Sequence, residues 1–304
     1  MKIVDAGSIS RAATTTFVAQ PALSLQIAEL EAELGMALLH RSARGVRPTQ
    51  AGELLYREAT QILRRVERLP ELLRAGAGEV GGSVRLGIAS TLAAVLAGDF
   101  VAYCKTQLPK VTLTLVAEDS ASIRSKLLGH ALDLGIVFDP ETTTAGLTRD
   151  MLFRQRLFLV DRAPLPWRAD GVRLNQLADT PLVLPAHGNS LRALIEAQFA
   201  RAGLMPVVAV EANVLSSIAS AVLSGVGASI VPLGEFAGTA WQDSLAAVPI
   251  KPPIYQIACS TWAVDADFNS AGEAVRALLG PFTRQVMQRK AKAGMTPMEN
   301  GEEA

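Results

Sequence analysis

The chain has few of the residues on which catalytic and metal chemistry depend. Its 304 residues include two cysteines and three histidines: Cys104, Cys259, His40, His130 and His187. The histidines are scattered, and no thiol stands near one at the spacing of a metal site. No Gly-x-Ser-x-Gly motif occurs, and Gly225-Val226-Gly227 lacks the third glycine of a dinucleotide loop. The sequence therefore gives no support for an enzyme, and we expect no metal and no cofactor.

Long apolar runs and a secretion signal are also missing. No apolar stretch reaches the roughly 18 residues that span a bilayer, and the first residues lack the basic, apolar and small-residue succession of a signal peptide. Two distant cysteines indicate a reducing compartment. With 49% apolar and 19% charged residues the chain can bury a sizeable core, and its length indicates about two domains. We expect a cytoplasmic protein with no membrane association.

The formal net charge is zero, with 29 basic and 29 acidic residues, but the charge is unevenly distributed. Residues 1–75 carry ten Lys and Arg against eight Asp and Glu, an excess of two positive charges. No acidic residue occurs between Leu34 and Gly52, where Arg41, Arg44 and Arg47 fall. Contacts with DNA phosphates require a basic segment of this kind, although a solvated loop is an alternative.

Two short helices are predicted near the N-terminus. Ser8 can cap a helix that runs through residues 11–13, Pro21 suits the first position of a second helix, and Gly35 ends that helix. Its apolar residues recur at spacings of four, three and four, which predicts one buried stripe: Leu23, Ile27, Leu30 and Leu34. The pattern favours a helix-turn-helix, and an ordinary helical hairpin is the alternative.

A β-hairpin and a long helix are predicted next. Residues 38–48 form two extended segments around Ser42-Ala43-Arg44-Gly45 and indicate a wing, after which Thr49 caps a helix over residues 50–75. Apolar residues in this helix follow a 4-3-4-3-4 spacing, the seam of a two-helix coiled coil: Leu55, Ala59, Ile62, Val66, Leu69 and Leu73. We expect the seam to form a dimer, with packing on its own domain as the alternative.

A glycine-rich hinge at residues 76–82 marks the domain boundary. Beyond it the patterns predict strands 84–89, 111–117 and 134–138 with helices 91–105 and 122–132, an order that implies a parallel sheet covered by helices. A second unit follows, with strands 158–160, 182–184, 207–211 and 229–231 and helices 190–202 and 214–224. A strand near 257–264 and a helix over 271–288 would return to the first unit, before a polar tail at 291–304.

The sequence resembles the LysR-type transcriptional regulators. The resemblance rests on Gly7-Ser8, Ala12-Ala13, Ala19-Gln20-Pro21-Ala22-Leu23-Ser24, Gln26-Ile27, Leu30-Glu31, Leu34-Gly35, Leu38-Leu39, Arg41, Arg44-Gly45-Val46, Thr49 and Ala51-Gly52. A weaker match from 83 to about 288 includes Leu223-Ser224-Gly225-Val226-Gly227 and Val231-Pro232. Within the family the chain looks most like the nitrogen assimilation control group, on Lys2-Ile3-Val4-Asp5, residues 19–24, Arg44-Gly45-Val46 with Pro48-Thr49, and Leu159-Val160.

The resemblance implies an α/β protein in three parts: a winged helix-turn-helix over 1–49, a linker and dimerisation helix over 50–75, and a two-lobed effector domain, similar to periplasmic binding proteins, over 83–290. Lobe I would comprise 83–157 and 264–290, and lobe II 158–263. The implied function is sequence-specific transcription regulation as a homodimer or homotetramer. Its partners would be double-stranded DNA, RNA polymerase and a small organic, anionic effector between the lobes. Nitrogen assimilation control proteins are thought to need no coinducer, so an unused cleft is the alternative.

The candidate DNA-binding residues are Gln20, Pro21, Ser24, Leu25, Arg44 and Arg47. The resemblance implies that Gln20 and Ser24 read bases and that Pro21 shapes the helix entry. Leu25 lies opposite the apolar stripe and could pack on a thymine methyl, although a polar residue is common there in the family. Arg44 and Arg47 suit phosphates or a narrow minor groove, whereas Arg41 could be packed under the wing. Alternatively, Gln20 is only a cap and Ser24 is only solvated.

The candidate effector-binding residues follow the predicted strand ends: Ser90, Thr91, Ser120, Phe138, His187 and Asn189. In open α/β sheets ligands bind beyond the carboxyl ends of the strands, where helix N-termini offer free N–H groups suited to anions. Each hydroxyl or amide could instead be no more than a helix cap. Convergence on one cleft is implied by the resemblance alone.

The start of the chain departs from the family pattern. Family members usually carry further residues before the position of Met1, which form most of the first helix, and they prefer a core Leu where Thr16 stands. A misplaced start codon would explain the difference. The alternative function is a cytoplasmic small-molecule sensor module whose DNA binding is impaired by the loss of that helix.

We predict that in-frame codons upstream of Met1 encode an apolar-patterned stretch containing Leu and Phe. Such a stretch would cover Leu23 and Ile27, and leaving side chains of this kind in water costs on the order of 1.5–3 kcal/mol each. Reading the genomic sequence upstream checks this. A stop codon immediately before Met1, together with specific DNA binding by the chain as it stands, would contradict it.

Overall fold

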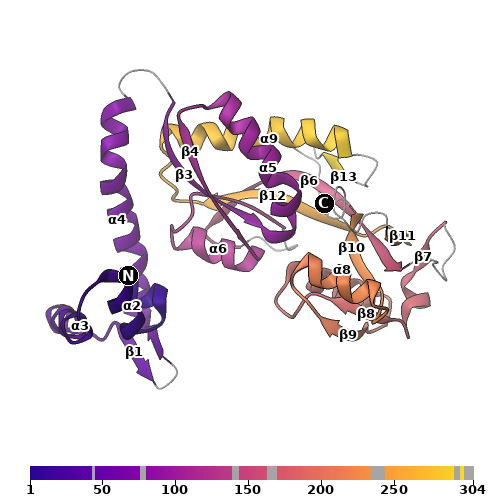
Figure 1. Ribbon diagram of the computed structural model, residues 1–304, viewed down its shortest axis with the longest axis horizontal. Helices are drawn as coiled ribbons and strands as arrows, with labels where there is room; N and C mark the ends of the chain where they lie inside the picture. The colour runs from indigo at the N-terminus through magenta and orange to yellow at the C-terminus, as the bar shows by residue number, and fades with distance from the viewer. Residues whose placement is uncertain are drawn as a thin grey trace. The chain divides into compact units, whose positions relative to one another are not determined.

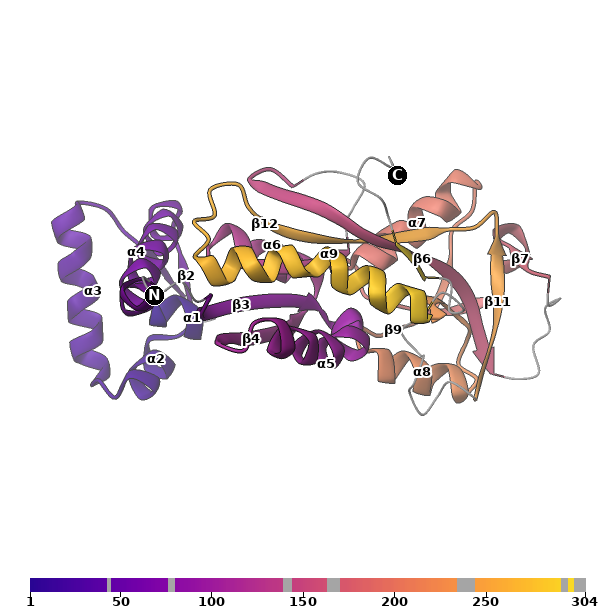
Figure 2. The same cartoon turned by 90° about the horizontal axis from the view of Figure 1, so that it is seen from above.

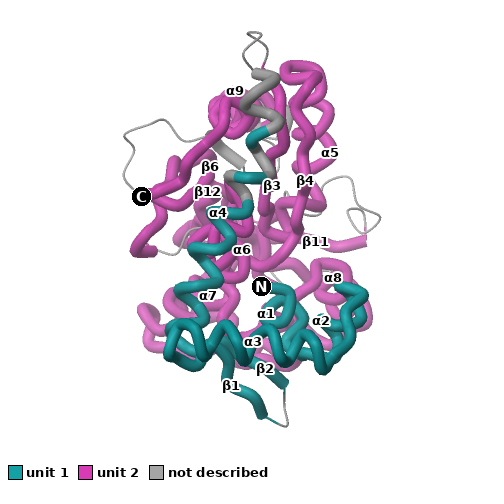
Figure 3. Tube along the Cα trace, turned by 90° about the vertical axis from the view of Figure 1, so that its left-hand side faces the viewer, with its two compact units in different colours: residues 1–74 teal, residues 75–304 magenta. Residues whose placement is uncertain are grey.

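The chain folds into two compact units, residues 1–74 and residues 75–304 (Figures 1 and 3). The computed structural model describes residues 1–42, 45–75, 80–138, 144–162, 170–233, 244–290 and 295–297. The predicted hinge at 76–82 is therefore described only from residue 80 onward.

Unit 1 contains the predicted winged helix-turn-helix and the long helix. Its elements are α1 (Lys2–Ala6), α2 (Ile9–Thr16), α3 (Gln20–Leu34), β1 (Leu39–Ser42), β2 (Gly45–Pro48) and α4 (Gln50–Ala75). The predicted caps are present: Ser8 Oγ accepts a hydrogen bond from the Arg11 N–H at 3.5 Å, and Thr49 Oγ1 accepts one from the Gly52 N–H at 3.0 Å. Because α3 begins at Gln20, Pro21 occupies its second position and not the first.

The apolar stripe of α3 is not buried, so that prediction was wrong. Leu23, Ile27 and Leu30 are half-buried, Leu34 is 42% exposed, and α3 contains no buried residue. Within the described part of unit 1, the buried apolar side chains are Ile3, Ala12, Ala13 and Leu38. The reason is the size of the covering elements, because α1 has five residues and α2 contributes mainly alanines.

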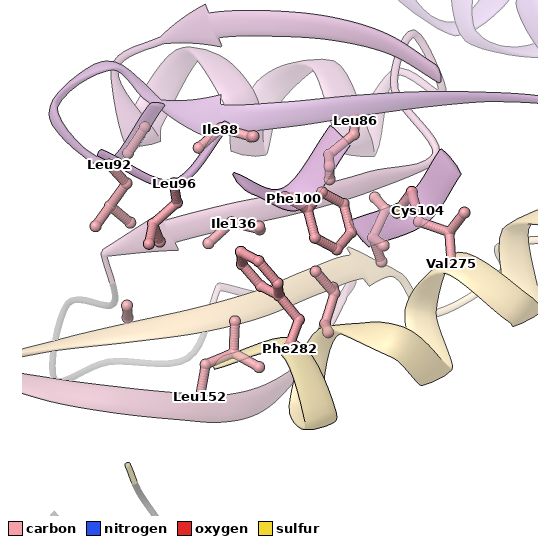
Figure 4. Close-up of a cluster of buried hydrophobic side chains, with 14 of the residues drawn as sticks. Leu86, Ile88, Leu92, Leu96, Phe100, Cys104, Ile136, Leu152, Val275 and Phe282 are labelled. Carbon is pink, nitrogen blue, oxygen red and sulfur yellow. The ribbon is translucent and has the colours of Figure 1, made fainter. Parts of the chain in front are cut away.

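Lobe I of unit 2 is a sheet in the order β4-β3-β5-β12-β6. Its strands are β3 (Gly82–Ala89), β4 (Val111–Glu118), β5 (Leu134–Phe138), β12 (Tyr255–Ala263) and the first half of β6 (Leu147–Arg162). As predicted, β3 is parallel to β4 and β5. Helices α5 (Ser90–Gln107) and α9 (Ser270–Lys290) pack on one core, where the rings of Phe100 and Phe282 lie 5.0 Å apart (Figure 4). Helix α6 (Ser120–Leu128) packs on a second, smaller core with Val137.

Lobe II is built on the second half of β6. That half pairs with β10 (Ser229–Pro232) and with β11 (Leu245–Lys251), which in turn pairs with β7 (Val172–Arg173). Strands β8 (Pro181–Leu184) and β9 (Val207–Glu211) form a parallel pair, and a 3-10 helix (Leu174–Leu177), α7 (Ser190–Arg201) and α8 (Leu215–Leu223) complete the lobe. Its core is separate from that of lobe I.

Three sequence-based predictions differ from the structure. The predicted strand 158–160 is part of β6, a 16-residue strand that runs through both lobes (Figure 2). The strand predicted near 257–264 returns to the sheet of lobe I as expected, where it pairs as β12 with β5, but the lobe II boundary predicted at residue 263 lies too late in the chain. Within the predicted polar tail, β13 (Met295–Pro297) pairs with residues 153–155 of β6. In each case the strand is held by partners far away in the sequence, which local patterns cannot reveal.

Candidate DNA-binding surface and regulatory domain

The first turn of α3 presents several candidate residues at the surface. Gln20, Pro21 and Leu25 are exposed, the last by 60%, while Ser24 is half-buried. The N-cap of α3 is Ala19, so Gln20 is the first helical residue and is not the cap. The Gln20 Oε1 accepts a hydrogen bond from the hydroxyl of Ser10 on α2, at 3.1 Å. Sequence reasoning missed Ser10, because nothing in its local pattern distinguishes it from a solvated serine.

The wing is a two-stranded hairpin in which His40 pairs with Arg47 and Arg41 with Val46. Arg41 and Arg47 are both exposed on the hairpin. Alternating strand residues point to opposite faces, and the two guanidinium groups therefore lie on opposite faces of the hairpin. Arg44 lies outside the described residues.

Backbone contacts fix the wing to the helices. The Val46 N–H donates to the Gly7 carbonyl at 2.9 Å, and Gly45 has φ of 121°, a conformation that side chains rarely adopt. The Glu31 Oε1 of α3 accepts hydrogen bonds from the N–H groups of Leu38 and Leu39, at 2.7 and 3.1 Å. Polar contacts thus join the wing to α3 and to Gly7.

The predicted dimer seam of α4 is half-buried in its first part and exposed in its second part. Leu55 and Ala59 are half-buried within unit 1, whereas Ile62, Val66 and Leu69 are 61%, 56% and 52% exposed. The side chain of Leu73 lies outside those described. Packing on its own domain therefore explains the first part of the seam and leaves the second part uncovered.

In lobe I, the structure brings two effector candidates together and gives them structural roles. The buried Ser120 hydroxyl accepts a hydrogen bond from the Phe138 N–H at 3.1 Å, and the Phe138 carbonyl accepts one from the Arg124 Nη1 at 3.1 Å. These bonds join α6 to the end of β5. Asp119 and not Ser120 caps α6, and hydrogen bonds from Ser122 lower the pKa of that carboxyl. Burial lowers the pKa of Arg124, partly offset by Asp119.

The remaining lobe I candidates stand at the start of α5. Ser90 is its first residue and is exposed, and Thr91 is half-buried. The N-cap of α5 is Ala89, which makes no side-chain capping bond. Neither Ser90 nor Thr91 is therefore the N-cap of α5.

In lobe II, Asn189 is the N-cap of α7, and its Oδ1 accepts a hydrogen bond from the Leu191 N–H at 2.9 Å. The His187 side chain is 74% exposed and lies 3.9 Å from the Glu196 carboxylate and 3.8 Å from that of Glu211. Both carboxylates also contact the buried guanidinium of Arg192, at 2.6 and 3.4 Å. Two carboxylates beside His187 are unfavourable surroundings for an anionic ligand.

Both cysteines are buried and free. Burial raises the pKa of the Cys104 thiol and of the Cys259 thiol to about 11. No group of three or more His, Cys, Asp or Glu side chains in the described ranges is arranged to hold a metal ion. Among the helices that can be described, none is long and apolar enough to cross a bilayer.

Comparisons with known proteins cover both units. Residues 1–53 match the family of bacterial regulatory helix-turn-helix proteins of the lysR family, and residues 77–284 match the LysR substrate binding domain. The nitrogen assimilation regulatory protein nac of Escherichia coli (strain K12) is 32% identical over 233 residues, 76% of this chain and 75% of that protein. The transcriptional regulator BbuR of Bordetella bronchiseptica is 30% identical over 76% of this chain and 71% of its own length.

Solved structures show the same fold. A cysteine-to-aspartate variant of full-length OxyR from Pseudomonas aeruginosa has a TM-score of 0.68 at 22% identity, covering 93% of this chain and 94% of that one. Full-length CbnR complexed with its target DNA has a TM-score of 0.58 at 22% identity, covering 93% and 96%.

We predict that both thiols are unreactive in the native protein. Because the thiolate is the reactive form, raising the pKa from 9.0 to about 11 keeps both groups neutral at pH 8. A chromogenic disulfide reagent at pH 8 should therefore react about a hundredfold more slowly with the native chain than with the denatured chain. Rapid reaction of either cysteine in the native protein would contradict the burial.

Proposed function

We propose that this chain, which belongs to the LysR family of bacterial regulatory helix-turn-helix proteins, reads operator DNA through the first turn of α3. It is a DNA-binding transcription regulator with an effector-binding domain. The N-terminal residues of a recognition helix meet base edges in the major groove. The observation that carries the proposal is the exposure of Gln20, Pro21 and Leu25 at that turn. Gln20 would hydrogen-bond a base and Leu25 would pack on a thymine methyl, with Ser24 beside them.

The wing would supply contacts to the DNA backbone. Arg47 is exposed on β2, and Arg44 is proposed with it from its place in the sequence, between the residues of β1 and those of β2. Guanidinium groups on a hairpin suit phosphates or a narrow minor groove, which position the protein without reading sequence directly. The similarity of the fold to CbnR, which was solved with its target DNA, supports this arrangement.

The exposed part of the α4 seam would bind a second copy of the chain. Three apolar side chains at coiled-coil spacing, each more than half exposed, leave a row that a matching helix could cover. Helix-turn-helix proteins bind operators as dimers on two half-sites. We therefore propose that the chain forms a homodimer, or a homotetramer built from two such dimers. Bound to its operator, the oligomer would contact RNA polymerase. Its location would be the cytoplasm, where the operator DNA lies.

The effector would bind between the lobes, at the carboxyl ends of the lobe I strands. Ser90 and Thr91 are the best candidates, because the hydroxyl of Ser120 and the carbonyl of Phe138 already join α6 to β5. From lobe II, His187 and Asn189 are weaker candidates, because two carboxylates lie beside His187 and the Oδ1 of Asn189 already caps α7. An organic ligand is favoured over a thiol-based signal, which the buried cysteines do not support. Because the chain is similar to nac, the alternative that it needs no coinducer stays open. Membership of a family of regulators argues against catalysis.

Gln20→Ala and Arg47→Ala should separate base reading from phosphate contact. Gln20→Ala should cost roughly 1–3 kcal/mol on the specific site and little on random DNA. Arg47→Ala should weaken both and make the salt dependence shallower by about one unit of slope. Titration of each variant against specific and scrambled duplexes at several salt concentrations measures both effects.

The matched control for base reading is Gln50→Ala, at an exposed glutamine that begins α4. It should leave sequence preference unchanged. If Gln20→Ala lost affinity equally on both duplexes, a different face of α3 would meet the DNA.

Ile62→Asp should disrupt the dimer, because assembly would then bury an unpaired charge on the seam. In sedimentation at a fixed concentration the variant should shift toward the monomer, and its footprint should shrink to a weakly bound half-site. Ile62→Leu keeps an apolar side chain at the same position and should behave like the unmodified chain. An unchanged sedimentation profile for Ile62→Asp would mean that the second copy binds elsewhere.

A further inference from the structure

We infer that Ser10 is a positioning residue that determines which bases Gln20 can read. The inference rests on the proposed function, in which the Gln20 side chain meets a base edge. It concerns the orientation of the Gln20 amide, which a hydrogen bond from the neighbouring helix holds in place.

The turn between α2 and α3 brings the two side chains together. Phe17 ends α2 in the left-handed conformation, with φ of 56°, and the Val18 N–H donates to the Ala13 carbonyl at 3.1 Å. After this tight turn the first residue of α3 lies beside the first turn of α2. The Ser10 Oγ donates to the Gln20 Oε1 at 3.1 Å, and both residues are exposed.

An amide side chain has two chemically different ends. The carbonyl oxygen accepts hydrogen bonds, and the NH₂ group donates two. A glutamine that reads adenine uses both ends, accepting from N6 and donating to N7. When the hydroxyl of Ser10 holds the Oε1 toward α2, the Nε2 is the end that faces away from the protein. Guanine, thymine and adenine each offer such a donor an acceptor in the major groove, so Gln20 should bind these three bases without the preference for adenine that the two-ended contact gives.

Thr14 provides a matched control on the same helix. It lies one turn after Ser10 and is exposed, but its hydroxyl donates to the Ser10 carbonyl at 3.1 Å. Thr14→Ala therefore removes a neighbouring exposed hydroxyl without removing the bond to Gln20. Ser10→Thr keeps a hydroxyl at the position that holds the amide.

The experiment uses the full chain. The Gln20→Ala variant first identifies the operator position at which base preference is lost, and four duplexes then carry the four possible base pairs at that position. Competition titrations give the relative affinities for the four base pairs. Ser10→Ala should raise the affinity for adenine, relative to guanine and thymine, about fivefold or more, since a bidentate contact becomes available. Ser10→Thr and Thr14→Ala should keep the original ranking, and thermal melting should show that all variants fold.

The outcomes separate this inference from the proposed function. An unchanged ranking in Ser10→Ala, with a relaxed preference in Gln20→Ala, would overturn the role of Ser10 and leave base reading by Gln20 intact. An equal loss of affinity for all four duplexes in Ser10→Ala would show a merely structural role and also overturn it. If no base pair lost preference in Gln20→Ala, both the proposed reading and this inference would be wrong.

Discussion

Thr49 joins the segment between α3 and the wing to the start of the long helix. Its hydroxyl donates to the Ala37 carbonyl at 2.7 Å, its N–H donates to the Leu38 carbonyl at 2.9 Å, and its Oγ1 caps α4. Gly52 allows this junction, because a Cβ there would overlap the Leu38 carbonyl. Since the described part of unit 1 buries few apolar side chains, polar contacts hold it together: those of Thr49, and those that join the wing to Glu31 of α3 and to Gly7.

In the regulatory domain, β6 is the strand that joins the two lobes. Its first half pairs with β12 in lobe I, and its second half pairs with β10 and β11 in lobe II. The core changes from that of lobe I to that of lobe II between Phe153 and Leu157. Between these residues Gln155 is buried and donates to Gln256 of β12 at 3.4 Å. A ligand that changed the angle between the lobes would have to bend the strand there.

Local chemistry made much of this structure predictable. The caps at Ser8 and Thr49, the end of α3 at Gly35 and the hairpin each depend on a few adjacent residues, and the exposure of Leu25 follows from the helical period. Which elements cover an apolar stripe does not follow from the helical period, so the stripe of α3 was wrongly predicted as buried. The length of β6 was missed because Arg154, Gln155 and Arg156 look like a loop until their distant partners are known. Ser10 was missed for the same reason, since its bond joins two helices.

The central claim is that the chain recognises a specific operator through α3. The most direct test titrates the full chain against a duplex from its own upstream region and against a scrambled duplex of equal length, at one physiological salt concentration. Specific recognition predicts binding to the upstream duplex tighter by about a thousandfold or more. Equal affinity for the two duplexes would contradict the recognition of a specific operator in this upstream region. Equal affinity for every duplex in a random library would favour the alternative function, a small-molecule sensor with impaired DNA recognition.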